Sequence, residues 1–228
     1  MRVARKKASN IEEQMVRTRT IFSAFDAWYR YRKDGDAIGT FDKWNLDVRN
    51  DLATGDTIEF EARLTFTPVH RILRTYINFA EQADTPGSVF QQKGQELQET
   101  KKIARMMLVW LGGKGAPQHF PVYMAPYEQT EPKIVARLDE EYMLSPKEGI
   151  DGLYQVIAQV DEILREGDEV SAIRVIRDVP PTTMEVTTIS EALANFVEPA
   201  QELGVVIEPE DISVPYPAVL VRPIAVYR

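Results

Sequence analysis

The chain contains no cysteine and very little histidine, and both shortages exclude classes of chemistry. With no cysteine among 228 residues, there can be no disulfide, thiolate nucleophile, iron–sulfur cluster or cysteine-rich zinc site. Histidine is the commonest general base and metal ligand near neutral pH, yet only His70 and His119 are present. The chain therefore has too few histidines for a histidine-rich metal site and offers little for a catalytic triad. We expect neither a cofactor nor a metal.

Long apolar runs are also missing. The longest one extends from Met106 to Leu111, which is far shorter than a membrane span. The first ten residues, MRVARKKASN, are basic but lack the apolar stretch of a signal peptide. Together with the absence of cysteine, these features predict a cytoplasmic protein with no membrane span.

Positive charge is in short supply. The chain has 27 Lys and Arg against 35 Asp and Glu, a net charge of −8, which disfavours duplex nucleic acid as the main partner. Residues 1–8 are an exception to this acidic composition, and we interpret them as a basic flexible arm. The arm contains Arg2, Arg5, Lys6 and Lys7. Such an arm can contact nucleic acid or anionic lipid, or it can be a solvated tail.

The chain has no dinucleotide fingerprint, kinase motif set, nucleophile elbow or EF-hand loop. We expect His70 at the surface or in a second layer, in the first turn of a helix, and His119 in a loop, neither of them catalytic. The glycine-rich segment 112–117 reads as a helix terminator rather than a phosphate cradle. Two acidic clusters have carboxylates that can bind divalent ions but are typical of solvated strand ends: Asp139, Glu140 and Glu141, and Glu208, Glu210 and Asp211.

The first predicted element is an aromatic helix over about residues 10–33. Ser9 and Glu12 have the spacing of a capping box, and apolar side chains follow at helical intervals up to Trp28 and Tyr29. Such a stripe packs on its own domain, which we favour, or on a second subunit.

The rest of the chain alternates strand and helix patterns. Period-two alternation over residues 58–66 predicts the clearest strand, and Thr67 and Pro68 then begin a helix. A second helix is expected over residues 89–111. Residues 156–176 read as a β-hairpin of the kind found in small barrels. A later helix is expected to begin at Thr188 and to end or kink at Pro199.

These elements predict an α+β protein with an antiparallel or mixed sheet of about six to eight strands and about four packed helices. We expect two lobes: a helix-rich one with one clear strand over residues 9–113, and a mainly β one with one helix over residues 114–228. The last strand, residues 217–228, is apolar at nearly every position but contains Pro217 and Pro223. It is therefore expected to be an edge or terminal strand partly covered on both faces.

Four segments carry a family resemblance: GDTIEFEARLTF, KIVARLDEEYM, LYQVIAQVDEILREGDEV and the closing PAVLVRPIAVYR. Over about Thr54 to Arg228 the chain resembles a bacterial family catalogued as domain of unknown function number six-four-one-four. The resemblance implies no activity and no catalytic residues.

Three functions follow from the residues. The favoured one is a non-enzymatic regulatory or adaptor protein of the bacterial cytoplasm. It binds another protein or a small ligand through the cleft between the lobes or through the aromatic first helix, or self-associates through that helix. The second is a nucleic-acid or nucleotide-associated module using the basic arm. The third is a hydrolase using Asp139–Glu141 and a divalent ion. The residues expected to bind a partner lie on the first helix: Trp28, Tyr29, Tyr31, Arg30 and Arg32.

Overall fold

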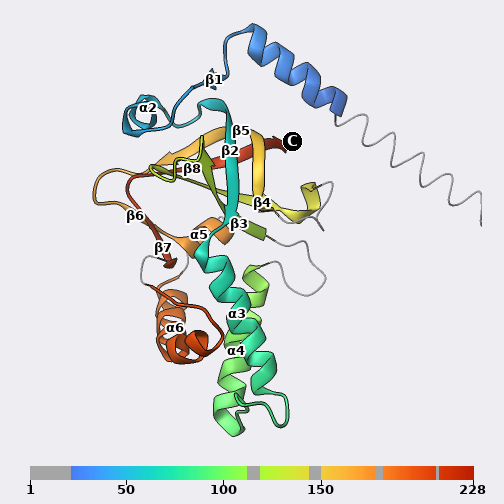
Figure 1. Cartoon of the computed structure of the whole chain (residues 1–228), viewed down its shortest axis with the longest axis vertical. Coiled ribbons are helices and arrows are strands. Elements are labelled where there is room, and N and C mark those ends of the chain that lie inside the picture. Colours follow the sequence, from blue (N-terminus) through green and yellow to red (C-terminus); the bar gives the residue numbers. More distant parts are fainter. Residues whose placement is uncertain (1–21, 112–118, 144–149, 178–181, 209–210) are drawn as a thin grey trace, which may run out of the picture. The chain divides into compact units, whose positions relative to one another are not determined.

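The computed structural model describes residues 22–111, 119–143, 150–177, 182–208 and 211–228. The protein is α+β, as the sequence predicted, with a mixed sheet and helices packed on it (Figure 1). The chain divides into two compact units, residues 1–40 and residues 41–228. The lobe boundary predicted at residues 113 and 114 stays a prediction.

Unit 1 contains a helix over residues 22–34 and the two-residue strand β1, Gly39–Thr40. The helix ends in a hydrogen-bonded turn. The Ala37 amide donates to the Arg32 carbonyl at 2.9 Å, and the Asp36 amide donates to the Lys33 carbonyl at 3.1 Å. Asp36 has a positive φ of 51°, so this end is a Schellman motif with aspartate at the left-handed position that glycine usually takes.

Unit 2 is built on a closed five-stranded barrel of β2 (Thr57–Phe66), β3 (His119–Pro126), β4 (Lys133–Asp139), β5 (Gly152–Ile163) and β8 (Ala218–Tyr227). Neighbouring strands run in the order β2, β3, β4, β8, β5, and β5 pairs again with β2. Only β4 and β8 are parallel. The order β5, β2, β3, β4 is a Greek key, and β8 closes it.

The barrel interior confirms the strand predicted over residues 58–66. In β2, Ile58, Phe60, Ala62 and Leu64 are buried in the barrel core, whereas Arg63 and Thr65 are exposed. The core continues with Val122, Met124, Ile134, Val156, Val160, Val219 and Val221 from the other four strands. The short helix α2 (Leu46–Asp51) follows Trp44, which is buried in the same core.

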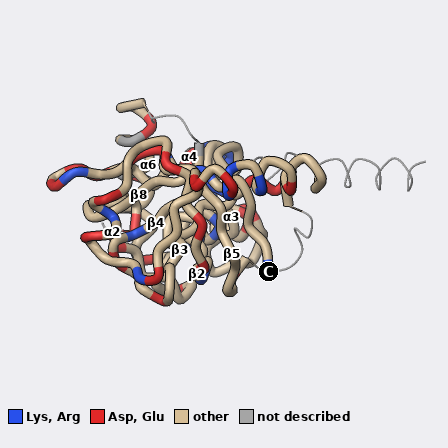
Figure 2. Tube along the Cα trace, turned by 90° about the horizontal axis from the view of Figure 1, so that it is seen from above, with Lys and Arg blue, Asp and Glu red and all other residues tan. Residues whose placement is uncertain are grey.

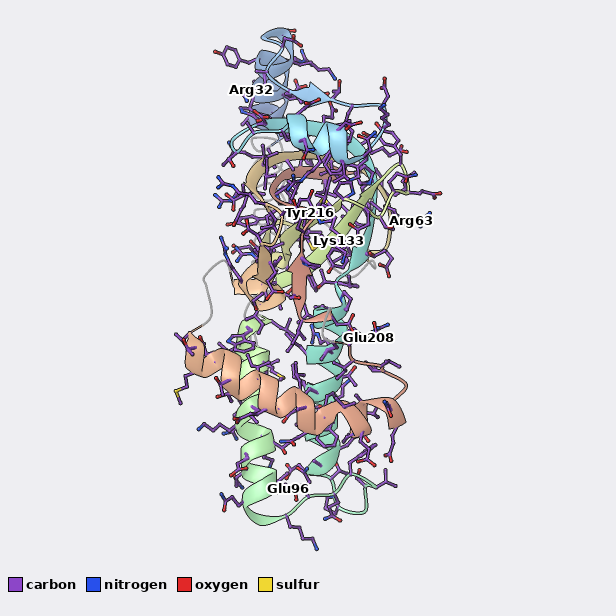
Figure 3. The ribbon with its side chains drawn as sticks, turned by 90° about the vertical axis from the view of Figure 1, so that its left-hand side faces the viewer. Arg32, Arg63, Glu96, Lys133, Glu208 and Tyr216 are labelled. Carbon is purple, nitrogen blue, oxygen red and sulfur yellow. The ribbon has the colours of Figure 1, made fainter. Side chains whose placement is uncertain are left out.

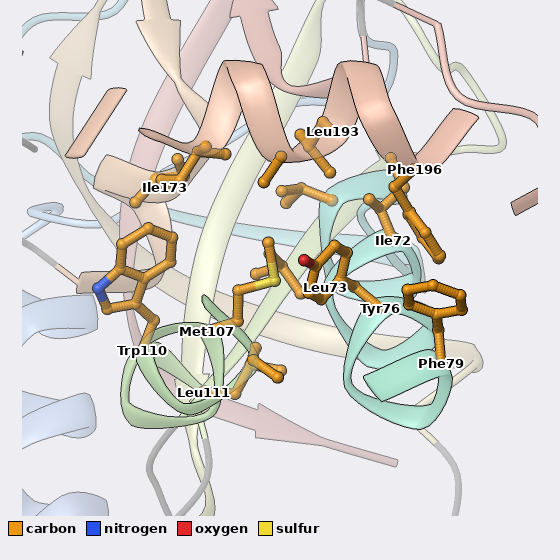
Figure 4. Packing of buried hydrophobic residues seen from close by; sticks show 14 of the residues in the cluster. Ile72, Leu73, Tyr76, Phe79, Met107, Trp110, Leu111, Ile173, Leu193 and Phe196 are labelled. Carbon is orange, nitrogen blue, oxygen red and sulfur yellow. The ribbon is translucent and has the colours of Figure 1, made fainter. Parts of the chain in front are cut away.

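Three long helices form a second layer: α3 (Pro68–Ala83), α4 (Gly94–Trp110) and α6 (Thr183–Glu202). α6 lies across α3 and α4 (Figure 3). Their shared core includes Tyr76, Phe79, Met107 and Phe196 (Figure 4). The rings of Tyr76 and Phe79 lie 4.9 and 5.2 Å from that of Phe196, distances typical of favourable aromatic pairs.

The outer face of β3, β4 and β8 is covered by three short elements: α5 (Ala172–Arg177) and the antiparallel pair of β6 (Glu169–Ser171) and β7 (Ser213–Pro215). A third apolar cluster fills this contact, with Val135 and Ala218 from the barrel and Val170, Val175 and Val214 from the covering elements. Both faces of this side of the barrel are therefore buried.

Two local predictions were wrong, and a third was wrong in part. Residues 156–176 do not form a hairpin, because β5 pairs with β2 and β8, β6 pairs with β7, and Ala172–Arg177 are helical. α6 begins at Thr183 and not at Thr188, and its capping box joins Thr182 and Glu185. Pro199 does not end the helix but lies inside it; the kink predicted as the alternative stays a prediction. The last strand is not an edge, since β8 pairs with both β4 and β5. It is the terminal strand and is covered on both faces, as predicted, because Val219 lies in the barrel core and Ala218 in the outer cluster.

β8 accommodates proline because its two pairings cover different lengths. β4 pairs with β8 only from Ala218 to Val221, so the missing amide of Pro223 costs nothing on that side. On the other side, a register shift between Ile157 and Ala158 falls where β5 faces Pro223, which is where a bulge allows proline within a sheet.

Candidate functional site

The helix over residues 22–34 has a face of aromatic side chains. Phe25 lies 5.9 Å from the ring of Trp28 and 6.0 Å from that of Tyr29, stacked on the latter at 19°. Phe22 is one turn before Phe25 and is 51% exposed, and Phe25, Trp28 and Tyr29 are only half-buried. We call Phe22, Phe25, Trp28 and Tyr29 the aromatic face.

The structure brings some of the predicted binding residues together and separates others. Trp28 and Tyr29 both contact Phe25 on the aromatic face. Tyr31 is 77% exposed and, at 100° per residue, points away from that face. Arg30 forms an exposed ion pair with Asp26 at 3.0 Å, and Arg32 donates to the Ala37 carbonyl at 3.1 Å, which ties it to the end of the helix.

The remaining predicted features of this region lie outside the described residues. These are the basic arm with Arg2, Arg5, Lys6 and Lys7, and the capping box of Ser9 and Glu12. The glycine-rich segment 112–117 lies outside them as well.

Charge is divided unevenly between the two units. Residues 1–40 carry nine Lys and Arg against five Asp and Glu, a net +4. Residues 41–228 carry 18 against 30, a net −12, and acidic positions are spread over the strands and helices (Figure 2). The aromatic face therefore belongs to the basic part of an acidic chain.

His119 was predicted in a loop, but it is the first residue of β3 and pairs across the sheet with Asp139. Its Nδ1 lies 2.6 Å from the Asp139 carboxylate, and Arg137 Nε contacts the same carboxylate at 3.0 Å. Sequence reasoning missed this cluster because the two strands join His119 and Asp139 across twenty residues of chain.

The acidic cluster at Asp139–Glu141 is divided by this arrangement. Asp139 is engaged by His119 and Arg137, while Glu140 and Glu141 belong to the 3-10 turn η1 (Glu140–Tyr142). The hydrogen bond to Glu141 raises the pKa of Tyr142. Over the described ranges, no group of three or more His, Cys, Asp or Glu side chains is placed to hold a metal ion.

In the second acidic cluster, Glu208 and Asp211 are linked by a hydrogen bond. The Asp211 carboxylate accepts from the Glu208 amide at 2.9 Å, and Glu210 lies outside the described residues. Aspartate side chains commonly stabilise turns in this way.

His70 was predicted at the surface or in a second layer, and it is not at the surface. It is only 9% exposed, and its ring stacks on Phe66 at 4.5 Å and lies 6.0 Å from Phe120. Burial, followed by the charge of Arg74, lowers the pKa of His70 from 6.5 to about 4. The aromatic surroundings explain the error, because α3 packs its first turn against the ends of β2 and β3.

An open pocket of about 390 Å³ lies in unit 2 next to Trp44. Its volume is in the range of ligand sites, and Asp47 and Glu131 give it an acidic rim. The full lining is Trp44, Asn45, Leu46, Asp47, Gln129, Glu131, Pro132 and Pro217. No histidine, lysine or hydroxyl side chain is among them, so the pocket offers no nucleophile and no general base other than a carboxylate.

These features define an α+β protein with a Greek-key barrel, a helical layer and a helix that has an aromatic face. The chain belongs to the family described as Domain of unknown function (DUF6414), which it matches over residues 3–227. Searches of curated proteins and of solved structures gave no match. Across the described parts of the chain, no helix has the length and apolar character needed to cross a membrane.

Proposed function

We propose that the protein is a non-enzymatic regulatory or adaptor protein of the bacterial cytoplasm that docks another protein through the aromatic face. The observation that carries this proposal is the incomplete burial of Phe22, Phe25, Trp28 and Tyr29 on one side of a helix. Aromatic side chains dominate the binding energy of protein interfaces. An amphipathic helix laid into a groove is a common way to present them.

The covered outer face of the barrel supports the aromatic face as the binding surface. Five-stranded Greek-key barrels include the OB fold, whose second and third strands form a ligand-binding face. Here the equivalent strands, β3 and β4, are covered on their outer face by α5 and by β6 and β7. A ligand at that face would have to displace Val170, Val175 and Val214 from an apolar cluster, so we place the function on unit 1.

A nucleic-acid-associated function is the second candidate, because residues 1–40 carry a net +4 and the helix has stacking side chains. The net −12 on the rest of the chain opposes the approach of a polyanion, so we rank this candidate below the adaptor. The hydrolase has no support from the described residues, since Asp139 is held by His119 and Arg137.

The test is a double variant, Trp28→Ala with Tyr29→Ala, used as bait beside the wild type in purification from the native host. We expect the variant to lose a protein that the wild type retains at matched bait levels. A matched control is Tyr31→Ala, which removes an exposed aromatic ring outside the aromatic face. Identical sets of retained proteins for all three baits would contradict the proposal.

Binding of single-stranded RNA by the purified protein separates the two candidates. The adaptor predicts weak or no binding near roughly 50 mM salt, whereas phosphate contact predicts binding that falls steeply as salt rises. Tight, salt-sensitive binding that disappears when residues 1–8 are deleted would reverse the ranking.

A further inference from the structure

The pocket beside Trp44 is formed by three segments of unit 2 that are far apart in the sequence. Residues 44–47 come from the start of α2, residues 129–132 from the connection between β3 and β4, and Pro217 from the link between β7 and β8. Figure 3 labels Lys133 and Tyr216, the sequence neighbours of the two lining prolines. The pocket has a volume of about 390 Å³ and belongs to a different unit from the aromatic face.

Hydrogen bonds hold the three segments together. The indole N–H of Trp44, a side chain that is only 3% exposed, donates to the Pro132 carbonyl at 2.6 Å. The Lys133 amide donates to the Pro217 carbonyl at 3.0 Å. The side chain of Asn45 caps the first turn of α2. The walls are therefore fixed before a ligand arrives, which lowers the ordering cost of binding.

The charged groups of the pocket are all acidic. Asp47 and Glu131 line it, and no Lys, Arg or His side chain does. Among the described residues, Asp47 forms no ion pair, and Glu131 pairs only with Lys133, at 3.8 Å. That distance is longer than a hydrogen bond. The pocket also lies in the unit that carries a net −12, so a positively charged ligand is favoured.

The other walls select the kind of cation. Leu46 is 46% exposed, and Pro132, Pro217 and the ring of Trp44 add further apolar surface. A guanidinium is more weakly hydrated than an ammonium, lies flat on such surfaces, and donates two parallel hydrogen bonds to one carboxylate. An arginine side chain therefore suits the pocket better than a lysine side chain.

The open mouth of the pocket indicates where the arginine comes from. Sites for free small molecules enclose roughly 70–90% of the ligand surface, whereas this pocket is open to solvent. A side chain that projects from a protein needs no such enclosure, because the rest of the partner covers the mouth. We infer that the pocket beside Trp44 receives an arginine side chain of a partner protein, with Asp47 and Glu131 as its acceptors. The inference goes beyond the proposed function, which uses unit 1.

The test is a nuclear magnetic resonance titration of the full-length protein with the peptide acetyl-Gly-Arg-Gly amide. The chain has three tryptophans, and the indole N–H of Trp44 lies in the pocket wall. We expect its signal to shift with a midpoint of roughly 1 mM, as suits a single charge-assisted contact. The signals of Trp28 and Trp110 should stay in place. The same peptide with citrulline, which has the shape of arginine without its charge, should produce no shift, and the lysine peptide should bind more weakly.

Variants assign the binding to the pocket. Asp47→Asn with Glu131→Gln is expected to raise the midpoint roughly tenfold, because both charged acceptors are lost. The matched control, Glu191→Gln with Glu198→Gln, removes the same charge from exposed positions of α6. It should leave the midpoint within about twofold, since general attraction by the acidic unit is then reduced equally.

Four results would overturn the inference: no shift of the Trp44 signal at roughly ten times the expected midpoint, equal shifts with the citrulline peptide, equal weakening by the two double variants, or tighter binding of spermidine at the same ionic strength. The last result would make a free polyamine the ligand. The proposed function fails separately, because the Trp28→Ala and Tyr29→Ala variant keeps every lining residue of this pocket and is expected to bind the arginine peptide normally.

Discussion

His70 shows how burial changes the chemistry of one residue. Its pKa is lowered from 6.5 to about 4 by burial and by Arg74. Between these two pH values the unfolded chain binds a proton that the folded chain does not. The contribution of His70 to the unfolding free energy is therefore fully present above pH 6.5 and is lost as the pH falls toward 4. The loss attributable to this group is about 3 kcal/mol at most.

We expect His70→Phe to remove this part of the acid sensitivity, because a phenyl ring fits among Phe66 and Phe120 without titrating. The measurement is urea unfolding of both proteins between pH 4 and 7. Parallel dependence of the unfolding free energy on pH in the two proteins would show that the pKa of His70 is the same in the folded and unfolded states, and would contradict the lowered pKa.

Arg49 is a buried cation held by neutral groups. It is 6% exposed, its guanidinium donates to the Asn50 side chain at 2.8 Å and to the Leu164 carbonyl, and it lies 5.1 Å from the Tyr216 ring. We expect Arg49→Met to cost about 1–3 kcal/mol, because the Leu164 carbonyl loses its donor. Arg63→Met, at an exposed ion pair with Glu128, is the matched control and should change the midpoint of urea unfolding little.

At the scale of elements, sequence periodicity correctly predicted an element that has one buried face and one face toward solvent. Alternation in β2 predicted its buried side correctly because one face meets the barrel core and the other meets solvent. α5 was predicted as a strand because Ile173, Val175 and Ile176 favour β structure. In the fold, Ile173 and Ile176 pack in the helical core and Val175 packs in the cluster over the barrel, and tertiary packing outweighs the propensity.

Strand β2 gives the first prediction at this scale. Phe60→Asp or Leu64→Asp is expected to unfold the protein, since each side chain is at most 2% exposed and a buried, unpaired carboxylate is very costly. Glu59→Ala and Arg63→Ala should stay within about 1 kcal/mol of the wild type. Thermal unfolding measures all four, and similar melting temperatures in the two pairs would refute the barrel register.

The capping box of α6 gives the second prediction at this scale. Thr182 accepts from the Glu185 amide, and Glu185 accepts from the Thr182 amide at 2.8 Å. Thr182→Ala is expected to lower the unfolding free energy by about 1 kcal/mol. Thr188→Ala, at the start that the sequence suggested, lies inside the helix and should have a smaller effect; the reverse order in urea unfolding would place the cap at Thr188.

At the scale of the molecule, the sequence predicted the fold class but not the barrel. Closure depends on β2 pairing with β5, which lies about ninety residues later in the chain, and no local pattern encodes such a pairing. The candidate site could be predicted from the sequence only in part. The stripe containing Trp28 and Tyr29 was visible in the spacing, but its exposure could be read only from the structure.

The proposed role of the aromatic face is that of a docking surface for another protein. The most direct measurement is the melting temperature of the Trp28→Ala and Tyr29→Ala double variant, followed by near-ultraviolet circular dichroism of the buried Trp44 and Trp110. We expect the same transition in both proteins. Loss of the folded signal in the double variant would show that these rings belong to the core and would contradict the account.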